Sequence, residues 1–475
     1  MRTCHPLLSD RSAGILLHVT SLPGPHGIGD LGRPAIDFLD WLSRTGCRIW
    51  QVLPIGPVGK GNSPYSSGSS FAIEPLLVSL EELVEDGLLP RAALRAKPPI
   101  KNSKVDYQAT RRFKEPLFHQ AFETFQSESR ARRAGFKSFM KRSGHWLEPW
   151  CAWSERKTGG SREEHAFRQF ILDRQWRTLK KEAGKRGILI FGDLPIFVPM
   201  ESADVGESPE LFRLGADGSP ELVSGTPPDS FSKKGQLWGH PQYRWSAHQK
   251  TGFEWWISRI ERQLELFDIL RIDHFIGLHR SWMIPGTART AGSGRWRRVP
   301  GRDMLQALRK RLGDMPLVAE DLGGMTPAVE TLRDDFGLPG MSLLQNAFDE
   351  DDAPGLPHSL ERASVVYTGT HDNDTTRGWW RGLSNASRKR LMTYAGSDGT
   401  RPHETLIRLA LASTANTAII PLQDLLGLGR KARMNVPGIA SGNWRWRLET
   451  GMLRNHEAAN LRRMTEVTGR FSCDP

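Results

Sequence analysis

The sequence predicts an α/β protein of the (β/α)8 barrel class, also called a TIM barrel, with subdomains inserted after two of its strands. Short β-branched and apolar runs bounded by turn residues alternate with helical patterns, which is the order of a parallel sheet built from βα units. About eight such runs occur, and eight parallel strands close a barrel. The expected strands cover residues 14–19, 48–54, 188–193, 269–273, 317–320, 341–345, 365–369 and 418–421.

Two of the expected helices have clear boundary signals. Residues 34–45 begin with Pro34, which suits the first turn of a helix, and Gly46 stands just past the end. Residues 167–185 have an amphipathic pattern that stops before Gly187. We expect both helices to pack their apolar faces on the barrel.

Two intervals are too long to be simple crossovers between strands. Residues 57–165 follow the second strand and carry helical, basic segments, whereas residues 199–250 follow the third strand and are rich in Gly, Pro and Ser. Segments that follow barrel strands lie on the catalytic face. We therefore expect one catalytic barrel domain over residues 1–475, with an inserted helical subdomain at 57–165 and an inserted loop subdomain at 199–250.

Composition limits the class of protein without identifying it. The chain has 475 residues and is 38% hydrophobic, which is enough to bury a large core. Its four cysteines, Cys4, Cys47, Cys151 and Cys473, lack metal-binding or disulfide spacing, which favours a reducing compartment. The N-terminus has no signal-peptide pattern, and no apolar run approaches the roughly 20 residues that span a bilayer. We expect a cytoplasmic protein without a membrane segment.

The net charge of +12 and the pI near 9.7 raise the question of nucleic-acid binding. The basic residues are spread over the expected helices, and no recognition module accompanies them, so a solvated surface is the better interpretation. The sequence contains neither an Asp-x-Asp-x-Asp-Gly loop nor a phosphate-binding glycine loop. We expect no nucleic-acid partner, no metal and no cofactor; the oligomeric state stays open.

Acidic residues follow three of the expected strands at the point where each strand ends, namely Asp273, Glu320 and Asp372. Because the carboxyl ends of barrel strands meet at one face, three such acids indicate one site. Arg271 lies two residues before Asp273 on the same face of the strand, and Arg271 and His274 together favour the charged form of that acid. Glu320 follows apolar residues, which would raise its pKa enough to keep a proton.

A single acid at a strand end is as readily explained by a salt bridge as by catalysis, so the argument depends on all three. Asp321 and Asp374 stand at strand-to-helix turns, where carboxylates satisfy free N–H groups. We expect these two acids to cap helices or to support the site.

Further motifs extend over almost the whole chain. They occupy residues 16–18, 20–25, 27–32, 62–67, 192–198, 227–229, 235–239, 294–296, 433–435, 437–438 and 442–444. Together with the three acid-bearing segments, they resemble glycoside hydrolase family 77, the amylomaltases or disproportionating enzymes, which are 4-α-glucanotransferases. The resemblance implies a retaining transfer of α-1,4-glucan segments to the 4-hydroxyl of glucose or another glucan, with Asp273 as nucleophile, Glu320 as general acid and base, and Asp372 as transition-state stabiliser.

The resemblance also implies a set of substrate contacts. These are Ser63, Tyr65, Asp193, Gln236, Trp238, Arg271, His274, Asp349, His371, Asn435 and Asn443. Tyr65 is expected to stack on a sugar near the cleavage point, and Trp238, in the loop at 227–239, to cover the acceptor side. Asn435 and Asn443 are alternatively turn residues, since both stand beside Gly or Pro.

Four positions depart from the usual pattern of the family. Ile276 stands where an arginine is common, His240 replaces an Asn, Ser230 replaces an aromatic residue, and Asn346 replaces a Phe. These departures leave chain-length preference and cyclisation open. Two alternative functions are an α-amylase-like hydrolase, in which water replaces the sugar acceptor, and a non-catalytic glucan-binding protein, against which the three acids argue.

Overall fold

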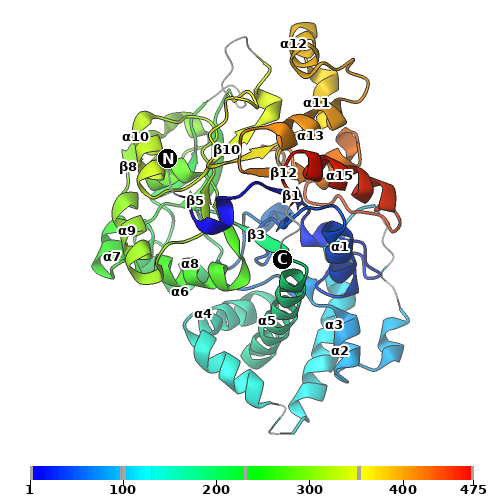
Figure 1. Ribbon diagram of the computed structural model, residues 1–475. Coiled ribbons are helices and arrows are strands. Elements are labelled where there is room, and N and C mark those ends of the chain that lie inside the picture. Colours follow the sequence, from blue (N-terminus) through cyan, green and yellow to red (C-terminus); the bar gives the residue numbers. More distant parts are fainter. Residues whose placement is uncertain are drawn as a thin grey trace.

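The computed structural model describes residues 4–96, 98, 103–129, 131, 133–228, 233–349 and 355–471. Its centre is a sheet of eight parallel strands in the order β10-β11-β12-β1-β2-β3-β6-β9 (Figure 1). They are β1 (Ser12–Leu16), β2 (Ile49–Gln51), β3 (Leu189–Leu194), β6 (Ile269–Ile272), β9 (Leu317–Ala319), β10 (Gly340–Leu343), β11 (Ser364–Tyr367) and β12 (Thr417–Pro421). Each of the eight strands expected from the sequence overlaps one of these.

The first and last strands of this order meet and close the barrel. The Ala319 N–H at the end of β9 donates to the carbonyl of Pro339, just before β10, over 2.9 Å. The Met341 N–H on β10 donates to the Asp321 carboxylate over 2.7 Å. Closure removes free strand edges, and the predicted (β/α)8 class is confirmed.

Alternate residues of each strand point into the barrel and toward the helices. Phe191, Ile269, Val318 and Ile419 belong to one buried cluster, which fills the interior. Their neighbours along the same strands belong to a larger cluster that includes the surrounding helices. The interior is therefore a packed core, and polar groups reach it only near the strand ends.

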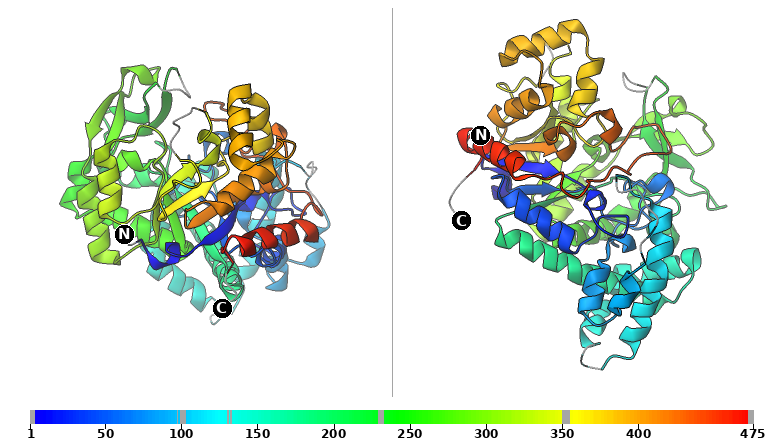
Figure 2. Two further views of the ribbon diagram at one scale, coloured as in Figure 1. Left: turned by 45° about the horizontal axis from the view of Figure 1, so that its top comes forward. Right: turned by 90° about the vertical axis from the view of Figure 1, so that its right-hand side faces the viewer.

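The helices lie outside the barrel, and several of them pack on its outer side (Figures 1 and 2). They are α1 (Arg33–Ser43), α2 (Leu80–Glu85), α3 (Tyr107–Gln126), α4 (Ala134–Thr158), α5 (Arg162–Lys185), α6 (Ala203–Glu207), α7 (Trp245–Lys250), α8 (Glu254–Leu266), α9 (Gly301–Leu312), α10 (Pro327–Asp335), α11 (Thr376–Gly382), α12 (Asn385–Ala395), α13 (Pro402–Ala412), α14 (Leu422–Leu425) and α15 (Asn455–Val467).

Local sequence signals set the ends of the two helices with predicted boundaries. Gly46, shortly after α1, has a φ of 74°, and Gly187, shortly after α5, has a φ of 65°. Both values lie in the left-handed region that glycine adopts without steric cost. Helix α5 begins at Arg162 rather than at residue 167, because the Ser161 hydroxyl accepts the Glu164 N–H over 3.2 Å and caps an earlier turn.

The two long connections have different structures. Between β2 and β3, helices α2, α3 and α4 precede α5, and α3 and α4 extend away from the barrel (Figures 1 and 2). Between β3 and β6, the elements α6, β4 (Leu222–Thr226), β5 (Gln236–Pro241) and α7 precede α8. β4 and β5 join β7 (Arg280–Pro285) and β8 (Arg295–Arg298) in an antiparallel sheet ordered β5-β4-β7-β8. The subdomain boundaries at 57–165 and 199–250 stay predictions.

The cysteines are thiols without disulfide partners within the described part of the chain. Cys4 is half-buried, and Cys47 and Cys151 are buried. Burial raises the pKa of the Cys47 and Cys151 thiols to about 12, which keeps them unreactive. Cys473 lies outside the described residues. Among the helices that the structure describes, none has both the length and the apolar character to cross a membrane.

Gly192 on β3 offers a test of how closely the barrel packs. A Cβ atom at this position would lie 2.2 Å from Cδ2 of Phe267. We predict that Gly192→Ala lowers the free energy of unfolding by about 1–3 kcal/mol, because the added methyl group overpacks the core. Urea denaturation followed by tryptophan fluorescence measures the difference. Gly184→Ala in α5 is the matched control: its Cβ would meet nothing within 4 Å, and the variant should be neutral or more stable. Equal destabilisation of the two variants would contradict close packing at Gly192.

Candidate active site

The three predicted acids lie on the face formed by the carboxyl ends of the strands. Asp273 directly follows β6, Glu320 directly follows β9, and Asp372 lies in the loop between β11 and α11. A fourth acid, Asp193, lies on β3 and pairs in register with Arg271 on β6. Side chains that face each other in register on neighbouring parallel strands share one face of the sheet, which brings Asp193 to the same site.

The Arg271 guanidinium connects the carboxylates. Its Nη1 lies 2.8 Å from each Asp193 oxygen and 2.9 Å from Oδ1 of Asp273, and its Nη2 lies 4.0 Å from Oε2 of Glu320. Burial by itself would lower the pKa of Arg271, but Asp193 and Asp273 raise it well above the ordinary value. Arg271 is therefore a permanent cation at the centre of the site.

Burial raises the pKa of both Asp273 and Glu320, and Arg271 opposes the rise in each case. The sequence predicted a raised pKa for Glu320 only. The difference arises partly from His274, whose pKa burial lowers to about 4, so that its imidazole is neutral and adds no positive charge beside Asp273. The two acids share one guanidinium and hold a proton more readily than free carboxyl groups do.

Backbone N–H groups fix the orientation of Glu320. Its Oε2 accepts the N–H of His274 over 2.7 Å, and its Oε1 accepts the N–H of Leu322 over 3.0 Å. His274 has a φ of 51°, an uncommon value for a residue with a side chain. This left-handed conformation lies at the turn where the His274 N–H donates to Glu320. The side chain of Asp273 stays 27% exposed and that of Glu320 11% exposed, so both carboxyls are reachable from the cleft.

Asp372 has its own set of supporting contacts. The Asn435 side-chain amide donates to Oδ1 of Asp372 over 2.6 Å, and Nε2 of His371 lies 3.4 Å from the same oxygen. Arg433 donates to the backbone carbonyl of Asp372. Asn435 thus holds the side chain of this acid and Arg433 its backbone.

An aromatic group lies between Asp193 and Asp372. The Tyr65 hydroxyl donates to Oδ2 of Asp193 over 2.7 Å, and its ring stacks on His371 with centroids 5.1 Å apart and an interplanar angle of 17°. Trp444 contacts both rings, at 5.7 Å from Tyr65 and 5.8 Å from His371. The site therefore combines flat apolar surfaces with ionised oxygens, a combination suited to a sugar ring.

Trp238 and Gln236 lie on strand β5, although the sequence indicated a loop. β5 pairs with β4. The strand was not recognisable in the sequence because Gly235 and Gly239, both with positive φ, are residues typical of loops. The Trp238 ring meets the His274 ring edge-on at 4.9 Å, and its Nε1 donates to Oε1 of Gln236 over 3.2 Å. This strand therefore places Trp238 beside the residue that orients Glu320.

Other predicted residues have local roles in the structure. The Asn443 amide donates to the Val436 and Ile439 carbonyls over 3.2 and 2.9 Å, so it holds the 436–443 turn. The Ser63 hydroxyl accepts the Tyr65 N–H over 3.3 Å and shapes that turn. Asp349 is exposed. Of the departures, Ile276 is buried and Asn346 exposed, and Ser230 lies outside the described residues.

The two neighbouring acids support the structure around the site. Asp321 binds Arg333 and accepts the Met341 N–H, and Asp374 lies 2.6 Å from Nε of Arg430. Neither is the cap of the helix that follows; Thr375 caps α11 in place of Asp374. The structure therefore shows Asp321 and Asp374 supporting the site, and not capping helices.

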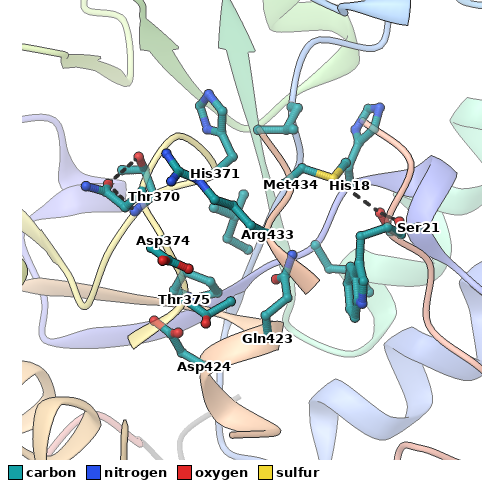
Figure 3. Close-up of a pocket in the computed structure, with 16 residues that line it drawn as sticks. His18, Ser21, Thr370, His371, Asp374, Thr375, Gln423, Asp424, Arg433 and Met434 are labelled. Atoms are coloured by element: carbon teal, nitrogen blue, oxygen red, sulfur yellow. Dashed lines mark hydrogen bonds between the residues drawn. The ribbon is translucent and has the colours of Figure 1, made fainter. Parts of the chain in front are cut away.

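A small pocket behind the 370–375 loop was not foreseen from the sequence. His18 and Ser21 line one side of it, Thr370 and Asp374 the opposite side, and Arg433 lies between them (Figure 3). Burial lowers the pKa of His18 to about 3, and its Nδ1 has no hydrogen-bond partner within the described part of the chain. His18 and Arg433 lie in the motifs at 16–18 and 433–435, which were the available signal for this part of the site.

A second group of ionisable side chains lies away from the strand ends. His26, Asp30 and Glu81 have ligand-type atoms within 4.8 Å of one another. This group was not predicted from the sequence, because Glu81 is far from His26 and Asp30 along the chain. The Lys114 ammonium lies 3.9 Å from the buried Asp30 carboxylate and donates to two backbone carbonyls. Lys114 supplies the positive charge that a bound cation would otherwise provide.

Comparison with known proteins identifies the family. The family model described as 4-alpha-glucanotransferase, glycoside hydrolase family 77, matches residues 17–163 and 151–453. The chain belongs to glycoside hydrolase family 77. The 4-alpha-glucanotransferases of Thermus thermophilus and Synechocystis are each 44% identical to it, over 97% and 98% of this chain and 99% of each relative.

Solved structures of the family agree with this fold. An amylomaltase from Streptococcus agalactiae, in complex with acarbose, superposes with a TM-score of 0.93 at 32% identity, over 98% of this chain and all of that one. An amylomaltase from Corynebacterium glutamicum has the same fold, with a TM-score of 0.82 at 18% identity, over 97% of this chain and 75% of that one.

Asn435 and Asn443 have different contacts in this family 77 protein: Asn435 binds Asp372, whereas Asn443 binds its own turn. Asn435→Ala should lower kcat about 10- to 100-fold, because a hydrogen bond to a charged group contributes about 1.5–3 kcal/mol and Asp372 loses it. Steady-state kinetics on maltotriose, together with the melting temperature, measures the effect. Asn443→Ala is the matched control: it removes hydrogen bonds within the 436–443 turn and should affect kcat less. A larger kcat loss in the Asn443 variant would show that Asn435 does not position Asp372.

Proposed function

We propose that this protein transfers segments of α-1,4-glucans by a retaining double displacement, from a donor maltooligosaccharide or starch-type glucan to the 4-hydroxyl of glucose or another glucan. The observation that carries the proposal is the gathering of Asp273, Glu320 and Asp193 around the buried Arg271, with Asp372 close by. Family membership supports it: the relatives at 41–44% identity are named 4-alpha-glucanotransferases, and the Streptococcus agalactiae amylomaltase binds acarbose.

In the first step, Asp273 attacks the anomeric carbon of the donor while the bond from that carbon to the leaving oxygen breaks. Glu320 gives its proton to the leaving oxygen, and the donor segment stays attached to Asp273 as an ester. In the second step, Glu320 takes the proton of the acceptor hydroxyl, whose oxygen attacks the anomeric carbon and releases Asp273. The anomeric configuration is retained because it inverts twice.

The contacts in the site suit these two roles. The Arg271 guanidinium hydrogen-bonds Asp273 at 2.9 Å, which favours its ionised, attacking form. Glu320 lies farther from the guanidinium, at 4.0 Å, and burial raises its pKa, which favours the protonated form that an acid needs. The His274 and Leu322 N–H groups orient its carboxyl and oppose part of that rise. Asp372, held by Asn435, accepts hydroxyls of the sugar whose ring distorts in the transition state.

Transfer rather than hydrolysis requires that a sugar acceptor outcompete water. Trp238 on β5 lies against His274, next to Glu320, and is half-buried. A sugar stacked there meets an apolar surface and displaces water from the intermediate. A hydrolase needs no surface that favours a sugar over water at this step, and a non-catalytic glucan-binding protein has no use for a buried Arg271 between ionisable acids.

Product analysis tests the proposed transfer. With maltotriose alone, the protein should release glucose and build a ladder of longer maltooligosaccharides, whereas Asp273→Asn should lose turnover by several orders of magnitude and still bind glucan. Chromatography of the products by size measures both results. Accumulation of glucose and maltose with nothing longer than the substrate would assign hydrolysis instead.

The pH dependence of kcat/KM tests the two acid roles. The active form has ionised Asp273 and protonated Glu320, so the rate falls at low pH when Asp273 takes up a proton and at high pH when Glu320 loses one. Because burial raises both pKa values, both limbs should lie above the ordinary carboxyl values of 3.8 and 4.5. The Asp372 charge raises the pKa of Asp273, so Asp372→Asn should move the acid limb to lower pH. An acid limb of the native enzyme below pH 3.8 would be inconsistent with this site.

A further inference from the structure

Strand β5 carries a row of three half-buried side chains on one of its faces. Gln236, Trp238 and His240 are half-buried, whereas Leu237 and Gly239 between them are exposed. This alternation is that of a strand with one face covered. Gln236 and Trp238 were predicted substrate contacts, and His240, on the same face, was not.

His240 contacts the turn that carries Tyr65. Its Nε2 lies 3.5 Å from the hydroxyl oxygen of Ser66, the residue after Tyr65. Burial lowers the pKa of His240 to about 4, so the imidazole is neutral near pH 7 and carries a single N–H. Within the described part of the chain, Nδ1 has no hydrogen-bond partner. In the tautomer that carries its proton on Nδ1, the Ser66 hydroxyl is the donor to Nε2 and the Nδ1–H is available to a ligand.

The contacts of β5 indicate which side of the site His240 borders, the donor side or the acceptor side. Trp238 meets the His274 ring at 4.9 Å, and the His274 N–H donates to Glu320 over 2.7 Å. In a double displacement, the residue that protonates the leaving sugar also deprotonates the acceptor, so the two sugars occupy the same side in turn. β5 therefore borders the acceptor side, and Asp372 with Asn435 lies on the β11 side of the site.

We propose that His240 is an acceptor-binding residue, whose Nδ1–H donates to a hydroxyl of the acceptor sugar while Nε2 is held by Ser66. The inference rests on the proposed transfer activity and assigns a further specificity residue to its acceptor side. An imidazole at this position offers the acceptor sugar a hydrogen-bond donor, Nδ1–H, whose direction is fixed because Nε2 is bound to Ser66. The imidazole ring also extends the surface formed by Trp238.

Two substitutions of His240 distinguish the role of Nδ1 from that of Nε2. The side-chain amide of Asn occupies the place of Nδ1, since both are bonded to Cγ, and the amide of Gln reaches the place of Nε2. His240→Asn therefore keeps the group facing the acceptor and loses the contact with Ser66, whereas His240→Gln keeps the contact with Ser66 and loses the acceptor group. A variant that only disturbed the fold would not distinguish the two nitrogens.

The measurement uses the full-length protein with maltotriose as donor and glucose as acceptor. His240→Gln should raise the KM for glucose about 5- to 10-fold and increase the ratio of hydrolysis to transfer, with kcat for donor cleavage changed by less than about twofold; the KM rise corresponds to the loss of one hydrogen bond. His240→Asn should keep the KM for glucose within about twofold of the native value. A KM rise in His240→Asn that equals or exceeds that in His240→Gln would overturn the proposal.

Ser66→Ala gives an independent measurement on a different element. It leaves Nδ1 in place but frees the ring, so the KM for glucose should rise less than in His240→Gln, and a larger rise would also count against the proposal. If the native protein makes no product longer than maltotriose, the transfer activity itself has failed. If the native protein makes such products but the His240 variants bind glucose as the native protein does, only the proposed role of His240 has failed.

Discussion

The buried Arg271 is the interaction on which the site depends. It is 5% exposed and lies within 4.0 Å of carboxylate oxygens of three residues: Asp193 on β3, Asp273 at the end of its own strand β6, and Glu320 at the end of β9. A guanidinium in this position cannot lose its proton, so it compensates the negative charges that the strand ends bring together. Without it, Asp193, Asp273 and Glu320 would repel each other in a desolvated space, and the carboxyls could not stay partly ionised.

The geometry around Arg271 follows from the register of the barrel. Because Asp193 and Arg271 are paired on β3 and β6, a shift of one residue would turn one of them toward the helices and leave the other without a partner. The closure between β9 and β10 has a similar effect on Glu320, since the Asp321 carboxylate that follows it accepts the Met341 N–H. Barrel closure and the position of Glu320 are thus connected through adjacent residues.

Most of the predicted substrate contacts come from segments outside the barrel strands. The Tyr65 turn follows β2, β5 belongs to the antiparallel sheet, and Asn435 with Trp444 comes from the C-terminal segment. These three segments contact one another around the acids: Tyr65 stacks on His371, and His240 meets Ser66. Rigid strand ends hold the acids proposed to react, and the added segments form the surface proposed to contact the sugar, which is the usual division in barrels of this class.

The sequence alone determined the eight strands, the positions of Asp273, Glu320 and Asp372 after three of them, and the family. The strands and the acids were predictable because strand ends are marked by short apolar runs and turn residues, which are local signals. The family was predictable because motifs along almost the whole chain resemble it. Only the tertiary structure decided that β5 is a strand, that burial makes His274 neutral, that Asn435 and not Asn443 holds Asp372, and that Asp193 shares Arg271 with Asp273. Each of these depends on partners far apart in the chain: pairing with β4, desolvation by neighbouring elements, and the register of β3 against β6. Such contacts leave no periodic trace in the sequence, because they are set by the three-dimensional packing of the barrel and its added segments.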